Sequence, residues 1–271
     1  MLPFENYGDE ASARLANGVT EDIVTDLARF HDLDVIARNS TEVHKGKPID
    51  VREVGKELNV GYVLEGSVQR QGDRIRITAQ LIDTRSNSEI SKIELQRAKR
   101  LPPSDLRAHD YFLLGKEAKS AVTRESVFRG IDFLDKAVAL DPNLARAYSI
   151  RAWLHYFSMM FGVDGATAIQ RTIEDAEKAV ALDPQDAESL ATLGFVRLYQ
   201  GRYEETDTLL RTAVDLSPAN SHVLILAAAG LADIGKPDEG ARFADRALRL
   251  DPRMTPANLI GVKEAYYLAR R

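Results

Sequence analysis

The sequence predicts an α+β fold, with a small α/β sandwich in residues 1–100 followed by an all-α solenoid of helical hairpins in residues 101–271. Two observations support this prediction. Apolar and polar residues alternate in parts of the first region, as in β-strands, whereas apolar residues recur with helical spacing throughout the second. In addition, a short phrase occurs four times with spacings of 42, 34 and 34 residues, and its copies end at Pro142, Pro184, Pro218 and Pro252.

The first region predicts the order strand, helix, strand, helix and β-hairpin, with the helices covering one face of the sheet. Residues 62–71 and 74–84 alternate in polarity, and Gly72-Asp73 between them is a two-residue hairpin signal. Residues 33–37 predict another short strand. One helix is expected to begin at Thr20, and its apolar stripe consists of Ile23, Leu27 and Phe30.

A second helix of this region is expected after Asp50, which we interpret as forming a capping box with Glu53. Residues 39–41 (Asn-Ser-Thr) precede a further helical segment. We interpret them as capping residues, and anion binding through free N–H groups is the alternative.

The composition argues against several classes of function. The chain carries 36 basic and 41 acidic side chains, and neither region is basic, which argues against a nucleic-acid partner. There is no cysteine, and therefore no disulfide or thiolate metal site. The longest strongly apolar stretch, residues 223–232, is too short to span a bilayer. We favour a cytoplasmic over a periplasmic location.

The 34-residue spacing equals the period of the tetratricopeptide repeat (TPR), and the second region resembles that family. In the clearest repeat, residues 187–220, Gly194 allows close helix packing, Gly201 ends the first helix and Pro218 sets the turn. Arg197 and Thr206 depart from the pattern, since they stand where an aromatic residue and an alanine are expected. The residues that carry the resemblance are Leu190, Leu193, Gly194, Gly201, Tyr203, Leu210, Ala213 and Pro218.

Four such hairpins are predicted, after a boundary marked by the helix-breaking prolines Pro102 and Pro103. The second hairpin is eight residues longer than the 34-residue period, and we interpret the extra residues, around 159–165, as a longer connection with its own apolar contacts. The tail is expected to form a helix that caps the stack. The predicted hairpins span residues 111–144, 145–186, 187–220 and 221–254, and the tail spans residues 255–271.

The TPR resemblance implies a concave groove, lined by the first helix of each hairpin, that binds a protein or peptide. One alternative is that its aromatic side chains belong to the core. Another is that the terminal helix fills the groove through Leu259, Val262, Tyr266 and Leu268. Formation of a homodimer is left open. The candidate groove residues are Arg146, Trp153, Tyr156, Phe195, Tyr199 and His222.

The first 90 residues resemble the TolB N-terminal-like domain. The segments that carry the resemblance are residues 2–6 (LPFEN), 18–23 (GVTEDI), 35–40 (VIARNS), 62–68 (YVLEGSV) and 76–83 (RITAQLID). This domain followed by TPRs implies the C-terminal region of a bacterial class III adenylate cyclase, especially of the rhizobial type. The alternative is the C-terminal region of a winged-helix transcriptional regulator.

The resemblance also predicts that the chain starts within a strand, as an excised or processed piece would. In relatives, Ile90 is followed by a further strand and a helix, whereas here Ser91 follows at once. Either that segment is deleted or the sequence skips residues at this junction.

No motif for catalysis or cofactor binding is found. Gly46-Lys47-Pro48 lacks the upstream glycine and the hydroxyl residue of a phosphate-binding loop, and the five histidines have no ligand-spaced partners. We therefore predict a non-catalytic regulatory and scaffolding region without metal or cofactor. A small-molecule sensor, with the ligand held against the sheet, is the alternative.

Overall fold

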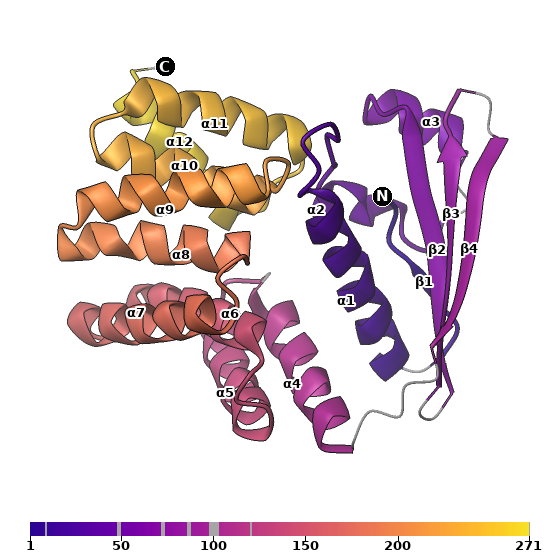
Figure 1. Ribbon diagram of the computed structural model, residues 1–271, viewed down its shortest axis with the longest axis horizontal. Coiled ribbons are helices and arrows are strands. Elements are labelled where there is room, and N and C mark those ends of the chain that lie inside the picture. Colours follow the sequence, from indigo (N-terminus) through magenta and orange to yellow (C-terminus); the bar gives the residue numbers. More distant parts are fainter. Residues whose placement is uncertain are drawn as a thin grey trace. The chain divides into compact units, whose positions relative to one another are not determined.

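The computed structural model describes residues 1–8, 10–47, 50–71, 74–85, 88–97, 103–119 and 121–270. The chain divides into two compact units (Figure 1). The α/β unit comprises Met1–Leu27 and Val35–Pro102, and the helical unit comprises Ala28–Asp34 and Pro103–Arg271. Among the described residues, no helix is both long enough and apolar enough to cross a bilayer.

The α/β unit contains one sheet with the strand order β1-β2-β3-β4 (Figure 1). β1 pairs in parallel with β2, and the other neighbours are antiparallel. The predicted hairpin is confirmed, because β2 and β3 pair from Tyr62 opposite Asp83 to Gln71 opposite Arg74. Its turn, Gly72-Asp73, lies outside the described residues. The strands are β1 (Glu5–Asn6), β2 (Tyr62–Gln71), β3 (Arg74–Asp83) and β4 (Ser88–Arg97).

The junction between Ile90 and Ser91 lies inside β4. The strand is continuous there, and its pairing with β3 shifts register between Leu81 and Ile82, because Ser91 pairs with Leu81 whereas Glu89 pairs with Ile82. Ile90 is therefore the extra residue of a bulge. The deletion and the skipped residues that the resemblance suggests at this junction both stay predictions.

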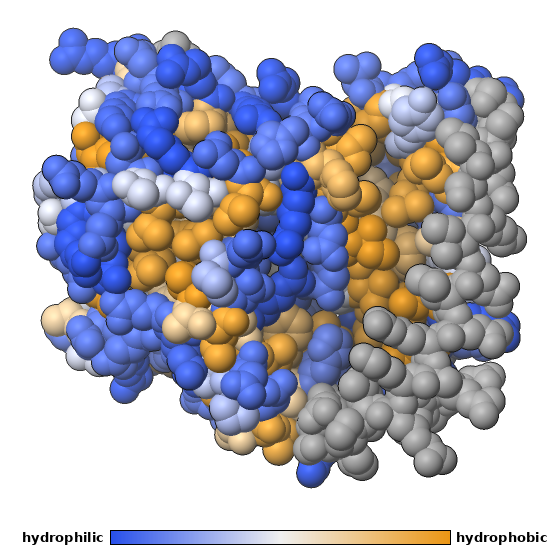
Figure 2. All heavy atoms as spheres, viewed as in Figure 1, coloured by the Kyte–Doolittle hydropathy of each residue, from blue (hydrophilic) through white to orange (hydrophobic). Residues whose placement is uncertain are grey.

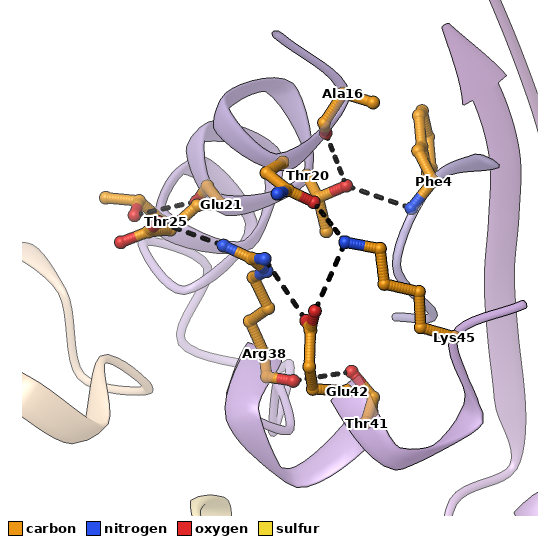
Figure 3. Close-up of polar contacts among 10 residues, drawn as sticks. Phe4, Ala16, Thr20, Glu21, Thr25, Arg38, Thr41, Glu42 and Lys45 are labelled. Atoms are coloured by element: carbon orange, nitrogen blue, oxygen red, sulfur yellow. Dashed lines mark hydrogen bonds and ion pairs between the residues drawn. The ribbon is translucent and has the colours of Figure 1, made fainter. Parts of the chain in front are cut away.

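The first helix of this unit begins ten residues earlier than predicted. α1 spans Glu10–Leu27, so Thr20 lies inside it. The Thr20 hydroxyl donates to the carbonyl oxygen of Ala16 (2.8 Å) and accepts from the Phe4 N–H (3.0 Å), as Figure 3 shows. The prediction was wrong because a threonine that starts a helix and one that bonds back to the preceding turn look alike in sequence. Phe30 lies beyond the helix and is 60% exposed, so it is not part of the apolar stripe.

Residues 33–37 are irregular, so the strand predicted there is wrong. Val35 and Ile36 are both buried, whereas neighbouring residues of a half-buried strand would point to opposite faces. The capping interpretation of residues 39–41 is wrong as well, and anion binding there stays a prediction. These residues lie within α2 (Arg38–Thr41), where Thr41 donates its hydroxyl to the carbonyl oxygen of Arg38 at 2.8 Å.

A set of polar contacts joins α1 to α2 and the following 3-10 helix η1 (Glu42–His44) (Figure 3). The Arg38 guanidinium lies 3.6 Å from the Glu21 carboxylate and 3.1 Å from that of Glu42. Lys45 donates to Glu42 at 3.3 Å and to the Asn17 side chain at 2.9 Å. These contacts hold α2 and η1 against α1.

The last helix of the unit, α3 (Val51–Glu57), is capped by Asp50, as predicted. The carboxylate accepts from the N–H of Arg52 at 2.9 Å, rather than from Glu53 as in a capping box. Val51 and Val54 of α3 pack with Val63 and Ile82, which lie directly opposite each other on β2 and β3.

Burial occurs on both faces of the sheet. Val63 and Val68 of β2 are both buried, although they are five positions apart and side chains alternate between the faces of a strand. This differs from the one-sided cover that the sequence predicts. The reason is that α3 packs where β2 begins, whereas Phe4, whose N–H donates to Thr20 of α1, lies beside Gly66 in the middle of β2.

The described residues of the helical unit form four helical hairpins and a final helix, which confirms the predicted all-α solenoid (Figure 1). The hairpins are α4 (Pro103–Lys119) with α5 (Arg124–Leu140), α6 (Ala145–Ser158) with α7 (Gly165–Leu182), α8 (Ala187–Arg197) with α9 (Tyr203–Leu216), and α10 (Ser221–Asp233) with α11 (Pro237–Leu250); the final helix is α12 (Pro256–Leu268). Two 3-10 turns, η2 (Met159–Phe161) and η3 (Leu198–Gln200), extend α6 and α8.

Close packing explains the special residues of the third hairpin. Gly201 has φ 69°, a left-handed conformation that ends η3, and a Cβ atom on Gly194 would lie 3.0 Å from Leu209 Cβ. Arg197, which replaces an aromatic residue, is buried and binds the carboxylates of Glu177 (2.8 Å) and Glu205 (3.1 Å). The two carboxylates therefore balance the charge of this buried arginine.

The longer connection of the second hairpin is also confirmed. It consists of η2 and a left-handed Gly162 at φ 95°, and Arg124 donates to the carbonyl oxygen of Phe161 at 2.8 Å. The side chain of Met160 is 63% exposed, so the predicted apolar contacts do not include it. On the face that Figure 2 shows, hydrophobic side chains of the helical unit are interrupted by hydrophilic ones.

Candidate functional site

Aromatic rings from three consecutive hairpins meet in the helical unit. Trp153 stacks on Tyr156 with ring centroids 5.3 Å apart and meets His222 edge-on at 5.5 Å. Phe195 lies edge-on to both Trp153 (6.1 Å) and Tyr156 (5.6 Å). We call the set the aromatic cluster; its members are Trp153, Tyr156 and Phe157 of α6, Phe195 of α8, Tyr199 of η3 and His222 of α10.

The cluster has a buried base and an accessible side. Phe157 and Phe195 are buried, Trp153 and Tyr156 are half-buried, and the Tyr199 side chain is 52% exposed. The interpretation of the aromatic residues as core therefore applies to the two phenylalanines. The remaining rings lie on this base with part of their surface in solvent.

The hydroxyl groups of Tyr156 and Tyr199 bond to each other at 2.9 Å. Burial raises the pKa of Tyr156, and the bond to Tyr199 raises it further. Burial also raises the pKa of Tyr199. The nearby carboxylates of Asp233 and Glu264 raise the pKa of both hydroxyls. Both tyrosines therefore stay neutral at physiological pH.

A second group of side chains, which we call the polar cluster, lies next to His222. It consists of Lys119 at the end of α4, Glu188 in the first turn of α8, Asn220 before α10, and His222 itself. Asn220 donates to Glu188 at 3.0 Å, and the Lys119 Nζ lies 3.4 Å from the His222 Nε2. Because an ammonium group can only donate, the Nε2 atom accepts and the ring is neutral.

Opposing effects set the charges of the polar cluster. Burial disfavours the Glu188 carboxylate, but the charges of Lys119 and Arg146 and the hydrogen bond from Asn220 outweigh burial and lower its pKa. Burial lowers the pKa of His222, and the charge of Lys119 lowers it further, against the opposing effect of Glu188. The cluster thus contains an ionised carboxylate, a basic side chain beside it and a neutral histidine.

The structure brings together five of the six candidate groove residues, namely Trp153, Tyr156, Phe195, Tyr199 and His222. Arg146 is instead close to two carboxylates outside the aromatic cluster, Glu188 and Asp186. Its positive charge acts to lower the pKa of both, against the effect of burial, which raises it. Whether these residues bind a partner stays a prediction.

The terminal helix α12 packs on α10 and α11. A Cβ atom on Gly261 would lie 3.0 Å from the side chain of Ile225 in α10, and Val262 is buried. Tyr266 donates to the carboxylate of Asp245 in α11 at 2.6 Å, and Leu268 is 40% exposed. α12 therefore extends the stack as a capping helix, as predicted, and the alternative set Leu259, Val262, Tyr266 and Leu268 does not act as one apolar plug.

Sequence reasoning missed part of the site. Lys119 and Glu264 were not among the candidate residues. The position of Asp233 beside the groove can be inferred from the sequence, because Asp233 follows Tyr199 by one 34-residue period. Lys119 and Glu264 lie in the first and last helices of the stack, where the repeat pattern is weakest. Among the described residues, no group of three or more His, Asp or Glu side chains is arranged to hold a metal. The absence of metal, cofactor and catalysis stays a prediction.

The geometry of repeated hairpins defines the helical unit as a TPR-like solenoid, in a chain that also contains a small α/β unit. The family model described as the HilA/YgeH-like transcriptional regulator, second domain, matches residues 1–109. A putative adenylate cyclase 3 from Rhizobium meliloti (strain 1021) is 56% identical over 84 residues. That match covers 31% of this chain and 14% of the length of that protein.

Solved structures resemble the chain at low identity. TTC0263, a TPR protein from Thermus thermophilus, has a TM-score of 0.48 and 15% identity over 59% of this chain and 81% of its own. PilF from Pseudomonas aeruginosa has a TM-score of 0.46 and 24% identity over 62% of this chain and 72% of its own.

Proposed function

We propose that this chain is a non-catalytic regulatory and scaffolding region that binds a protein or peptide partner through the aromatic cluster. The observation that supports the proposal most directly is the convergence of Trp153, Tyr156 and Tyr199 from two hairpins on a buried phenylalanine base. Such rings offer a large contact area at a small cost in conformational entropy. The hydroxyl groups of Tyr156 and Tyr199 bond to each other and hold these two rings in place.

We further propose that the region belongs to the C-terminal part of a class III adenylate cyclase. The 56% identity with the putative cyclase supports this proposal, as does the resemblance of residues 1–90 to the TolB N-terminal-like domain. The second candidate is the C-terminal region of a winged-helix transcriptional regulator, and the family model matching residues 1–109 favours it. Both candidates assign the same partner-binding role to the helical unit and differ in the attached output domain.

The binding role can be tested with short random peptides displayed on phage and selected on the 271-residue chain. Because Trp153 is the only tryptophan of the chain, its fluorescence reports binding at the cluster directly. Selected peptides should change this signal, and Tyr199→Ala should weaken them about tenfold or more. Tyr203→Ala is the matched control, since Tyr203 is 57% exposed but lies at the start of α9 outside the cluster. Equal binding by both variants would overturn the proposal.

The non-catalytic role has its own test. The purified chain is incubated with ATP and Mg²⁺, and cyclic nucleotide is measured against a buffer blank. We expect no product above the blank, because no nucleotide-binding motif is found in the sequence. Detectable cyclic nucleotide would contradict the assignment.

A further inference from the structure

Two carboxylates lie at the accessible edge of the aromatic cluster. Asp233 ends α10 and Glu264 lies in α12, and both are exposed. Asp233 follows Tyr199 by 34 residues and so takes the equivalent position in the next hairpin. Successive hairpins thus present a tyrosine and then a carboxylate along the same line of the stack.

The packing of α12 brings Glu264 to this line. A Cβ atom on Gly261 would lie 3.5 Å from the Cβ of Ala229 in α10. Asp233 follows Ala229 by four residues, and Glu264 follows Gly261 by three, so each carboxylate lies one turn beyond this contact on the same helix face. Partial burial of the carboxyl groups raises the pKa of each, and the charge of Asp233 raises that of Glu264 further, as expected of neighbours.

These carboxylates differ from others in the helical unit. Glu239 binds Arg211 at 2.6 Å, and Asp175 binds Arg151 at 2.6 Å. Within the described residues, the structure gives neither Asp233 nor Glu264 a basic partner, and no positive charge contributes to their pKa values. The edge of the aromatic cluster is therefore negative without internal compensation, whereas Glu188 in the polar cluster is compensated.

We propose that this edge, formed by Tyr156, Tyr199, Asp233 and Glu264, selects a partner peptide by a lysine or arginine side chain. The hydrocarbon stem of that side chain would lie on the tyrosine rings, and its charge would face the two carboxylates. Aromatic faces attract cations through their quadrupole, and carboxylates add a salt-dependent attraction. This inference rests on the proposed function, because it names the chemistry of the partner that the aromatic cluster binds.

The test uses the peptides selected on the complete chain. We expect lysine and arginine to be enriched among them, and replacement of the enriched residue by norleucine or citrulline to weaken binding in the Trp153 fluorescence titration. Asp233→Asn combined with Glu264→Gln should weaken binding about tenfold and reduce its dependence on salt. Asp215→Asn, a change at an exposed carboxylate of α9, is the control and should leave binding unchanged.

A charge reversal sharpens the test. Selection repeated on the variant with Asp233→Lys and Glu264→Lys should enrich acidic peptides instead of basic ones. The inference would be overturned, with the proposed function left intact, by one result. The selected peptides would need Tyr199 but show no preference for basic residues, and they would bind the variant with Asp233→Asn and Glu264→Gln as well as the unchanged chain. Recovery of no Tyr199-dependent peptide would overturn both. Because both carboxylates are exposed, these variants are expected to fold, which circular dichroism checks.

Discussion

The aromatic cluster and the polar cluster both use residues of α8 and α10 and share His222, yet they differ in how their polar and charged groups are paired. In the polar cluster, Glu188 accepts a hydrogen bond from Asn220 and feels the positive charge of Lys119, so its own charge is balanced within the fold. In the aromatic cluster, Tyr199 is 52% exposed and the nearby carboxylates have no basic partner among the described residues. A cluster whose charges are paired internally stabilises the stack of hairpins, whereas an exposed surface whose charges lack such partners is suited to binding another molecule.

The largest expected effect tests the structural role of the polar cluster. Glu188→Ala removes the carboxylate and leaves its partners uncompensated, which should lower the free energy of unfolding by about 3 kcal/mol. Urea unfolding followed by Trp153 fluorescence measures the change. Glu174→Ala, at an exposed position on α7, is the control and should cost less than about 0.5 kcal/mol. Equal effects would show that the polar cluster does not support the fold.

The second prediction tests the aromatic cluster. Trp153→Ala should weaken a selected peptide by about 2 kcal/mol, because truncation of a central aromatic anchor removes much of the recognition energy. Fluorescence of a label on the peptide measures the affinity, and thermal unfolding measures stability. A drop in the unfolding midpoint of several degrees with unaltered affinity would assign the ring to the fold alone.

The third prediction uses the residue that the two clusters share. The pKa of His222 is lowered in the folded state, so the unfolded chain binds the proton more readily. Protonation therefore destabilises the fold as the pH falls below 6.5, the ordinary value, towards the folded pKa. We expect His222→Gln to reduce this loss by about 1–2 kcal/mol between about pH 6.5 and about pH 5. His31→Gln, at an exposed position, is the control, and identical pH profiles would contradict the prediction.

The smallest effect extends the comparison to the α/β unit. Thr20→Val should cost about 1 kcal/mol, because the buried N–H of Phe4 loses its acceptor. Thr25→Val removes only a bond to the carbonyl oxygen of Glu21 in the same helix and should cost less. Urea unfolding followed by circular dichroism separates the two, and a larger loss for Thr25→Val would refute the assigned role of Thr20.

The two regions were not equally predictable. In the helical unit each turn residue recurs, so Gly201 and Pro218 could be interpreted by comparison with their counterparts one period away. The α/β unit has no such internal copy. Its antiparallel hairpin was predicted correctly because the alternation is local. Residues 33–37 are mostly apolar without being a strand, and only Val35 and Ile36 among them are buried.

In the candidate site, too, the residues that follow the repeat could be predicted, and those placed by contacts outside the repeat could not. Ring positions could be derived from the helical period, which is why Trp153, Phe195 and Tyr199 were among the candidate groove residues, and the structure brings them together. The carboxylate of Glu264 could not be placed, because its position depends on how α12 docks at Gly261. Contacts made through a terminal helix have no counterpart in the repeat from which to infer them.

The close approach at Gly261 also affects how the molecule opens. Hairpins of a solenoid are held mainly by their neighbours, so opening can begin at an end and spread inward one hairpin at a time. α12 closes the C-terminal end with only a glycine separating its backbone from Ile225, and this leaves α10 shielded from solvent. A bulkier residue at position 261 would lift this helix first, and amide protons of α10 would then exchange with solvent sooner than those of α8.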